Sequence, residues 1–230
     1  MEFLENYFET AAGSITISGQ QGSDFAKSVA TDFNPIHDVG SKRFCVPGDL
    51  LFAIALSRYG LHQSMTFSFL DMVKADSELV YSNDVNQGVS YANGKPVLGI
   101  SASGASIDEP MAIESVLRKY VAFSGQNFPH ILMPLMEQHQ VMINPGRPLV
   151  IYESMSFDLK TLNFDDLDIR LEQTSLDVQG KRGNAVLNFS FNDKSGEVGR
   201  GAKKLVLSGL RPYDADAVKK MCDDYLACVA

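Results

Sequence analysis

The sequence has few cysteines and few histidines, and this limits the sites that it can form. Three cysteines, Cys45, Cys222 and Cys228, occur among 230 residues, and their spacing suits neither a disulfide framework nor a zinc site. The four histidines form no HxxxH or HExxH pattern, so no metal site is predicted. Unpaired cysteines are usual in a reducing compartment, and we therefore expect the protein in the cytoplasm.

Long hydrophobic runs and an excess of positive charge are also missing. No segment approaches the ~18 consecutive apolar residues of a membrane span, and the N-terminus has neither the cationic nor the apolar region of a signal peptide. Lysine and arginine number 20 against 28 aspartates and glutamates, a net charge of −8. This balance argues against binding to nucleic acid, which needs a basic face, but not against a small anionic ligand.

What the chain does contain is a hydrophobic fraction of 45%, which is enough for a sizeable core. The period of the hydrophobic pattern changes from helical to strand-like within the first half, and an Asn93-Gly94 turn predicts a hairpin. In order, the pattern predicts a strand at 13–18, a small helix at 23–31, an ordered loop at 32–46, an apolar helix from Pro47, and strands at 64–69, 78–81 and 88–103.

The second half repeats this order of elements. Two helical segments, 113–124 and 129–140, precede further strands, and a terminal helix is predicted at 214–229. Several matches in one register indicate an internal duplication, with units at residues 1–110 and 111–230. Three pairs of segments match: 64–69 with 154–159, 97–101 with 186–190, and the turn 93–95 with the turn 179–181.

One short segment, Asp32-Phe33-Asn34-Pro35-Ile36-His37, carries residue types that perform chemistry. Proline restricts the preceding residue to an extended conformation, so Asn34-Pro35 predicts a turn. The turn can place the carboxylate of Asp32 and the imidazole of His37 on the same side of the loop. Together these groups can hold and activate one water molecule, because one accepts a proton while the other donates one. The alternative is an Asx-type turn with a surface histidine.

This Asp-x-Asn-Pro-Ile-His segment resembles the signature of the MaoC-like, (R)-specific enoyl-CoA hydratases, which have the hotdog fold. With four fixed residues and one aliphatic choice, chance occurrence in a chain of this length is on the order of 10⁻⁴. The resemblance is specific over about residues 22–60 and architectural over the rest. It implies an α+β fold of two tandem hotdog units, each an antiparallel sheet wrapped around a buried helix.

In that family the aspartate and the histidine hold the water that adds to the double bond of a 2-enoyl thioester. The resemblance therefore implies that Asp32 and His37 are catalytic and that Asn34 positions their loop. A glycine at the start of the buried helix, here Gly48, offers its N–H to the thioester oxygen. A helix N-terminus suits this role because negative charge builds on that oxygen during the reaction.

Two basic residues, Lys42 and Arg43, follow the motif on the same loop and are candidates to bind the phosphates of CoA. A solvated basic loop is the alternative. Lys203 and Lys204 are weaker candidates for the same role.

The sequence also departs from the family pattern. The family usually has Ser-Gly-Asp where this chain has Ala30-Thr31-Asp32, and often His-Gly where it has Pro47-Gly48. Asp49 follows Gly48 directly and competes for the positive potential of the helix start. The second half keeps only an echo of the motif, 124–130, without the acid, so one site per two units is expected.

These features predict a hydratase or dehydratase that acts on an acyl thioester and needs no cofactor, since the thioester itself acidifies the carbon at position 2. One alternative is an acyl-CoA thioesterase in which Asp49 directs water at the carbonyl carbon. Another is a catalytically altered hotdog protein that binds acyl-CoA or a protein partner. The oligomeric state stays open, with a homodimer as one alternative, because two fused units already resemble a dimer.

Overall fold

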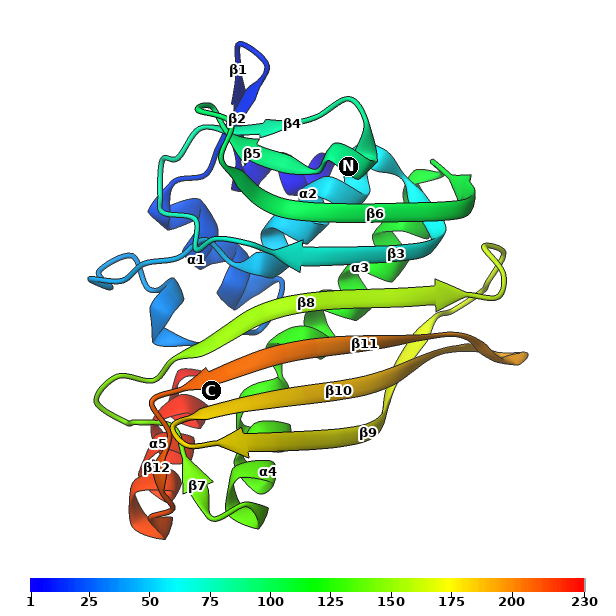
Figure 1. Ribbon diagram of the computed structural model, residues 1–230. Coiled ribbons are helices and arrows are strands. Elements are labelled where there is room, and N and C mark those ends of the chain that lie inside the picture. The colour runs from blue at the N-terminus through cyan, green and yellow to red at the C-terminus, as the bar shows by residue number, and fades with distance from the viewer. Residues whose placement is uncertain (230) are drawn as a thin grey trace.

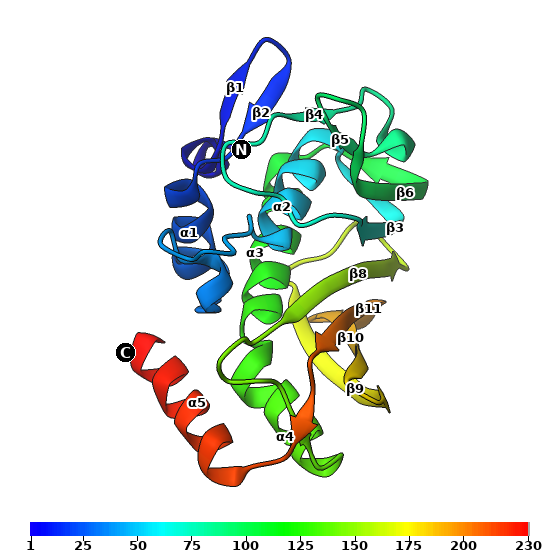
Figure 2. The ribbon, with the colours of Figure 1, turned by 60° about the vertical axis from the view of Figure 1, so that its left-hand side comes forward.

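The computed structural model describes residues 1–229, and its helices cover one face of a large sheet (Figures 1 and 2). The α-helices are α1 (Gly19–Ser28), α2 (Gly48–Tyr59), α3 (Pro110–Gly125), α4 (Met133–Gln138) and α5 (Ala215–Val229). Short 3-10 helices span Glu2–Tyr7, Pro35–His37 and Val85–Gln87, and a π-helical turn spans Phe128–Leu132. The strands are β1 (Glu9–Ala11), β2 (Ser14–Thr16), β3 (Leu61–Phe69), β4 (Leu79–Tyr81), β5 (Val89–Tyr91), β6 (Pro96–Ile107), β7 (Val141–Met142), β8 (Val150–Leu159), β9 (Asp168–Gln179), β10 (Arg182–Asp193), β11 (Gly196–Ser208) and β12 (Arg211–Pro212).

Ten of these strands form one antiparallel sheet in the order β1-β2-β4-β5-β6-β3-β8-β11-β10-β9, while β12 pairs with β7. β3 and β8 lie side by side in the middle (Figure 1). Outward from this central pair, the strands follow in descending order of their numbers on both sides of the sheet. They are β6, β5 and β4 beside β3, and β11, β10 and β9 beside β8. The prediction of a mixed fold with a large antiparallel sheet is confirmed.

The central pair of strands contains the first of the three sequence matches. Thr66 of β3 lies opposite Ser156 of β8, and Met65 opposite Phe157, so the two matching segments face each other symmetrically. The other two matches are wrong. Residues 97–101 belong to β6, next to the central pair, whereas 186–190 belong to β10, one strand further out.

The matched turns are likewise not equivalent, because 93–95 joins β5 to β6 and 179–181 joins β9 to β10. Alternating strands resemble one another wherever they lie, since a period of two reports only that one face is buried.

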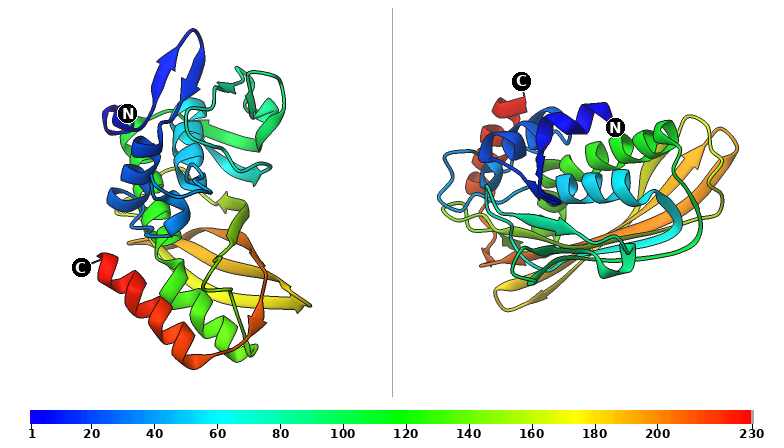
Figure 3. Two further views of the ribbon diagram at one scale, coloured as in Figure 1. Left: turned by 90° about the vertical axis from the view of Figure 1, so that its left-hand side faces the viewer. Right: turned by 90° about the horizontal axis from the view of Figure 1, so that it is seen from above.

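The predicted apolar helix is α2, which lies between the sheet and α3 (Figure 3). It is hydrophobic nearly all round, and its residues 50–56 are at most 3% exposed, as expected for a helix covered on every side. Phe52 packs edge-on against Phe67 of the sheet and against Tyr120 of α3, with ring centroids 5.0 Å apart in both pairs. One core therefore continues from α2 across α3 to the second half of the sheet.

The first helix begins earlier than predicted, at Gly19 rather than Ser23. Its start is a capping box: the Ser18 side chain accepts a hydrogen bond from the N–H of Gln21 (3.1 Å), and the Gln21 side chain accepts one from the N–H of Ser18 (2.9 Å). The Ser-x-x-Gln pattern that produces this cap is present in the sequence.

The helical segments of the second half, α3, the π-helical turn and α4, follow one another almost without a break. Pro129 and Pro134 interrupt the hydrogen-bond ladder of these helices, because proline has no N–H to donate. The predicted terminal helix is α5, which lies on the helical side of the molecule (Figure 2). None of the helices among the described residues has the length and hydrophobicity that a bilayer span requires.

Candidate active site

The loop after α1 folds through hydrogen bonds between neighbouring residues. Asn34 is extended (ψ 122°), as the following proline requires, and its side-chain oxygen accepts a hydrogen bond from the N–H of Ile36 (3.2 Å). The N–H of Asn34 donates to Oδ1 of Asp32 (2.9 Å). This Asx turn holds one carboxylate oxygen of Asp32 and leaves Oδ2 for another partner.

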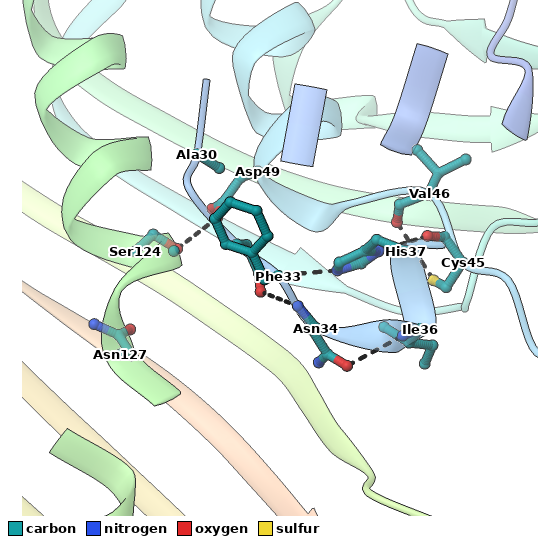
Figure 4. A network of polar contacts seen from close by, with 12 residues as sticks. Ala30, Phe33, Asn34, Ile36, His37, Cys45, Val46, Asp49, Ser124 and Asn127 are labelled. Carbon is teal, nitrogen blue, oxygen red and sulfur yellow. Dashed lines mark hydrogen bonds and ion pairs between the residues drawn. The ribbon is translucent and has the colours of Figure 1, made fainter. Parts of the chain in front are cut away.

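That partner is His37, whose Nε2 lies 3.6 Å from Oδ2 of Asp32 (Figure 4). The other ring nitrogen, Nδ1, lies 2.7 Å from the carbonyl oxygen of Cys45. A carbonyl oxygen only accepts, so Nδ1 carries a proton, and in the neutral imidazole Nε2 is then an acceptor. His37 is 9% exposed, so the alternative of a surface histidine is wrong.

The motif lines a cavity of about 280 Å³, and the structure brings four of the six predicted residues together there: Asp32, Asn34, His37 and Gly48. Lys42 and Arg43 are exposed on the neighbouring loop and do not line it.

Gly48 is the first residue of α2, and within the described chain its N–H has no hydrogen-bond partner. A larger side chain does not fit at this position. A Cβ would lie 3.0 Å from Tyr152 and 3.1 Å from Phe69, whose stacked rings cover it.

A second group of polar residues, not predicted as a site, lies on another wall of the cavity. Ser124 Oγ donates to Oδ2 of Asp49 (2.6 Å; Figure 4) and accepts from the ammonium of Lys203 (2.5 Å). Lys203 also donates to the carbonyl oxygen of Ser124 and to Oδ1 of Asn127, both at 3.0 Å, and lies 4.5 Å from the centre of the Tyr152 ring. These bonds use all three protons of the ammonium.

Burial dominates the electrostatics of this group. It raises the pKa of Asp49, although Lys203 and the Ser124 hydroxyl act in the opposite direction, and it lowers the pKa of Lys203. Oδ1 of Asp49 has no hydrogen-bond partner among the described residues. The sequence offered Lys203 as a weaker candidate to bind the phosphates of CoA. Its ammonium instead makes hydrogen bonds inside the protein.

A signal for the burial of Lys203 exists in the sequence. It is in phase with Leu205 and Leu207 along an alternating strand, and all three are at most 5% exposed, whereas Lys204 is out of phase and exposed. The alternating pattern gives no such signal for Ser124 of α3, with which Lys203 forms hydrogen bonds.

The backbone before Asp32 is strained. Thr31 has φ +53°, a conformation that glycine adopts freely and a β-branched residue rarely does. Thr31 therefore follows a backbone path that glycine takes more easily. Gly125 at the end of α3 packs tightly here, because a Cβ on it would lie only 1.8 Å from the carbonyl oxygen of Ala30.

The hydroxyl of Tyr225, on α5, holds the same backbone from the other side. It lies 3.3 Å from the N–H of Phe33, 3.4 Å from the carbonyl oxygen of Thr31 and 3.3 Å from that of Gly125. Burial raises the pKa of Tyr225 to about 12, so the hydroxyl keeps its proton and can donate it while accepting from Phe33.

We expect Tyr225→Phe to lower the free energy of unfolding by about 1–3 kcal/mol, because the substitution leaves partly buried backbone groups without a partner. Urea denaturation measures this. The matched control is Tyr7→Phe. Among the described residues the Tyr7 hydroxyl hydrogen-bonds only with the exposed Ser28 (3.3 Å), so the expected change is within about 0.5 kcal/mol. Equal effects of the two substitutions would show that the contacts of Tyr225 are unimportant.

Three comparisons place the chain among known proteins. A family model described as "Protein of unknown function (DUF3581)" matches residues 2–216. The search of curated proteins found no match.

Among solved structures, an acyl-CoA thioesterase II (TesB2) from Mycobacterium marinum is similar at 11% identity and TM-score 0.46, over 93% of this chain and 98% of that one. A tesB protein from Mycobacterium avium subsp. paratuberculosis has 12% identity and TM-score 0.43, over 89% and 96%. A MaoC-like dehydratase has 9% identity and TM-score 0.24, over 92% and 42%. TM-scores this low do not establish a common fold, and these similarities leave the function open.

Proposed function

This chain belongs to the DUF3581 family, described only as proteins of unknown function, and we propose from its site that it adds water reversibly to 2-enoyl thioesters of the acyl-CoA type. The product is a 3-hydroxyacyl thioester. The observation that carries the proposal is the approach of Asp32 Oδ2 to His37 Nε2, 3.6 Å apart in the wall of a cavity.

The geometry of this pair suits a bound water. The proton on Nδ1 of His37 points to the carbonyl oxygen of Cys45, so Nε2 is an acceptor, and so is the Asp32 carboxylate. Two acceptors 3.6 Å apart form no hydrogen bond with each other. A water molecule has two protons and can donate one to each. Its oxygen then keeps its lone pairs for the carbon at position 3 of the enoyl group.

In the proposed reaction the water oxygen bonds to position 3 of the acyl chain while one member of the pair takes a proton from it. The electrons of the double bond move toward the thioester, which becomes enolate-like. Position 2 then receives a proton from the pair, so the elements of one water are added in total. The unpartnered N–H of Gly48 lies in the same cavity and would donate to the thioester oxygen as its charge develops.

We also propose that the chain is a double hotdog, with one unit at residues 1–110 carrying the motif and another at 111–230. The matching strand order on both sides of β3 and β8 supports this division. Lys42 and Arg43, exposed on the loop after His37, would meet the phosphates of CoA.

Purified protein incubated with crotonyl-CoA should lower the ultraviolet absorbance of the conjugated enoyl thioester without releasing free thiol. The absorbance falls because hydration removes the conjugated double bond. A chromogenic disulfide reagent added in parallel detects any free thiol, because the thiol cleaves it by thiol–disulfide exchange. Unchanged absorbance over a range of acyl chain lengths, together with saturable binding of the thioester, would instead identify a binding protein.

A second candidate function, thioester hydrolysis, is favoured by Asp49. This carboxyl lines the same cavity, its Oδ1 has no partner within the described chain, and burial raises its pKa toward the range useful for a general base. Hydrolysis would release free thiol, and Asp49→Asn would abolish that release. Hydration at Asp32 and His37 does not require the Asp49 carboxylate, so the same variant should still lower the enoyl absorbance.

A further inference from the structure

A second cavity, of about 240 Å³, lies between α5 and the motif loop. Phe33 and Phe128 contribute to its walls from the site side, and Met221 and Tyr225 from α5. The remaining walls are mostly hydrophobic as well, and Asn34 and Asp224 are the polar residues among those that line it. A hydrophobic ligand of extended shape suits such a surface.

This cavity adjoins the site. Asn34, Phe128 and Val150 line both cavities, so the two cavities share part of their walls. Phe33, in the second cavity, follows Asp32 directly in the chain. A substrate whose reacting carbons lie at the Asp32–His37 pair therefore has a hydrophobic space within reach.

The wall of the site formed by Asp49, Ser124 and Lys203 is polar, whereas hydrophobic residues such as Leu51 and Leu132 line other parts of the same cavity. An apolar chain placed against this wall would cover charged and polar groups without forming hydrogen bonds, which is unfavourable. The side chains of this wall are buried and bonded to one another. An apolar chain is therefore better placed away from this wall, and the hydrophobic cavity under α5 offers room for a chain that extends past the site.

We propose that the cavity under α5 receives the acyl chain, and that thioesters of medium-length, unsubstituted acyl groups bind more tightly than thioesters of short or polar ones. This inference rests on the proposed function, because it takes the thioester to react at Asp32 and His37. Each methylene that leaves water for this cavity should tighten binding about fourfold at most.

The test uses the S-butyl and S-octyl thioethers of CoA, which lack the carbonyl and can be neither hydrated nor hydrolysed. Isothermal titration calorimetry on the full chain should show at least tenfold tighter binding of the octyl compound. Met221→Trp, which fills the cavity from α5, should remove this preference and leave butyl binding unchanged. Met111→Trp is the matched control, because Met111 is 79% exposed at the start of α3.

If Met221→Trp fails to fold, Cys228→Phe replaces it in the same experiment. Cys228 lines the cavity but is exposed, so phenylalanine there narrows the cavity with less disturbance of the fold. Equal affinity for both thioethers, or loss of both in Met221→Trp, overturns the assignment of the acyl chain to this cavity. That result does not affect hydration of crotonyl-CoA, which tests the proposed function separately. A preference for octyl that Met221→Trp removes supports the cavity assignment even if no hydration is found.

Discussion

Asp32→Asn and His37→Ala should each reduce the rate of crotonyl-CoA hydration by about 10²–10⁴-fold, the usual contribution of a general acid or base. Asparagine keeps the size of Asp32 and can still accept the hydrogen bond from the N–H of Asn34 through its carbonyl oxygen. It replaces Oδ2 with either an amide nitrogen or a neutral oxygen, so it cannot take a proton from water. Initial rates at saturating and limiting substrate separate this loss in kcat from any change in KM.

The controls for these variants lie in the same chain. Asp38→Asn removes a partly exposed acid that does not line the cavity and that pairs with Lys27 (2.7 Å). His62→Ala removes a histidine of β3 that does not line the cavity. Both controls should retain the wild-type rate within about twofold. Full activity in Asp32→Asn, with thermal stability unchanged, would disprove the role of the pair.

Lys203→Met should lower the free energy of unfolding by about 3–5 kcal/mol, because it leaves the Asp49 carboxylate buried without the nearest cation. It also removes the three hydrogen bonds that the ammonium donates to Ser124 and Asn127. Methionine has a similar length and keeps the packing against Tyr152. Urea denaturation followed by circular dichroism measures the change.

The neighbouring lysine provides a matched control. Lys204→Met lies on the same strand with its side chain exposed, and its expected effect is within about 0.5 kcal/mol. The double variant Asp49→Asn/Lys203→Met should recover much of the loss, because it removes both of the buried charges that Ser124 links. If Lys203→Met is no less stable than Lys204→Met, the ammonium of Lys203 does not stabilise the buried Asp49 carboxylate in the folded protein.

The parts of the site that lie close together in the chain could be predicted from the sequence. The turn at Asn34-Pro35 and the meeting of Asp32 with His37 depend on six consecutive residues, whose hydrogen bonds and proline restraint act locally. The burial of α2 was equally readable, because a helix with apolar residues on every side must be covered on every side. The double hotdog and its two units remain proposals.

Which distant residues complete the site was decided by the tertiary structure alone. Ser124, Lys203 and Tyr225 come from three elements, and their contacts join residues separated by 75 to 194 positions. Such contacts depend on the order and register of the strands and on where α3 and α5 pack. A pattern with a period of two or 3.6 records which side of an element is buried, not which element covers it. The sequence by itself therefore determined the local motif and the buried helix, and the packing of the whole chain decided what surrounds them.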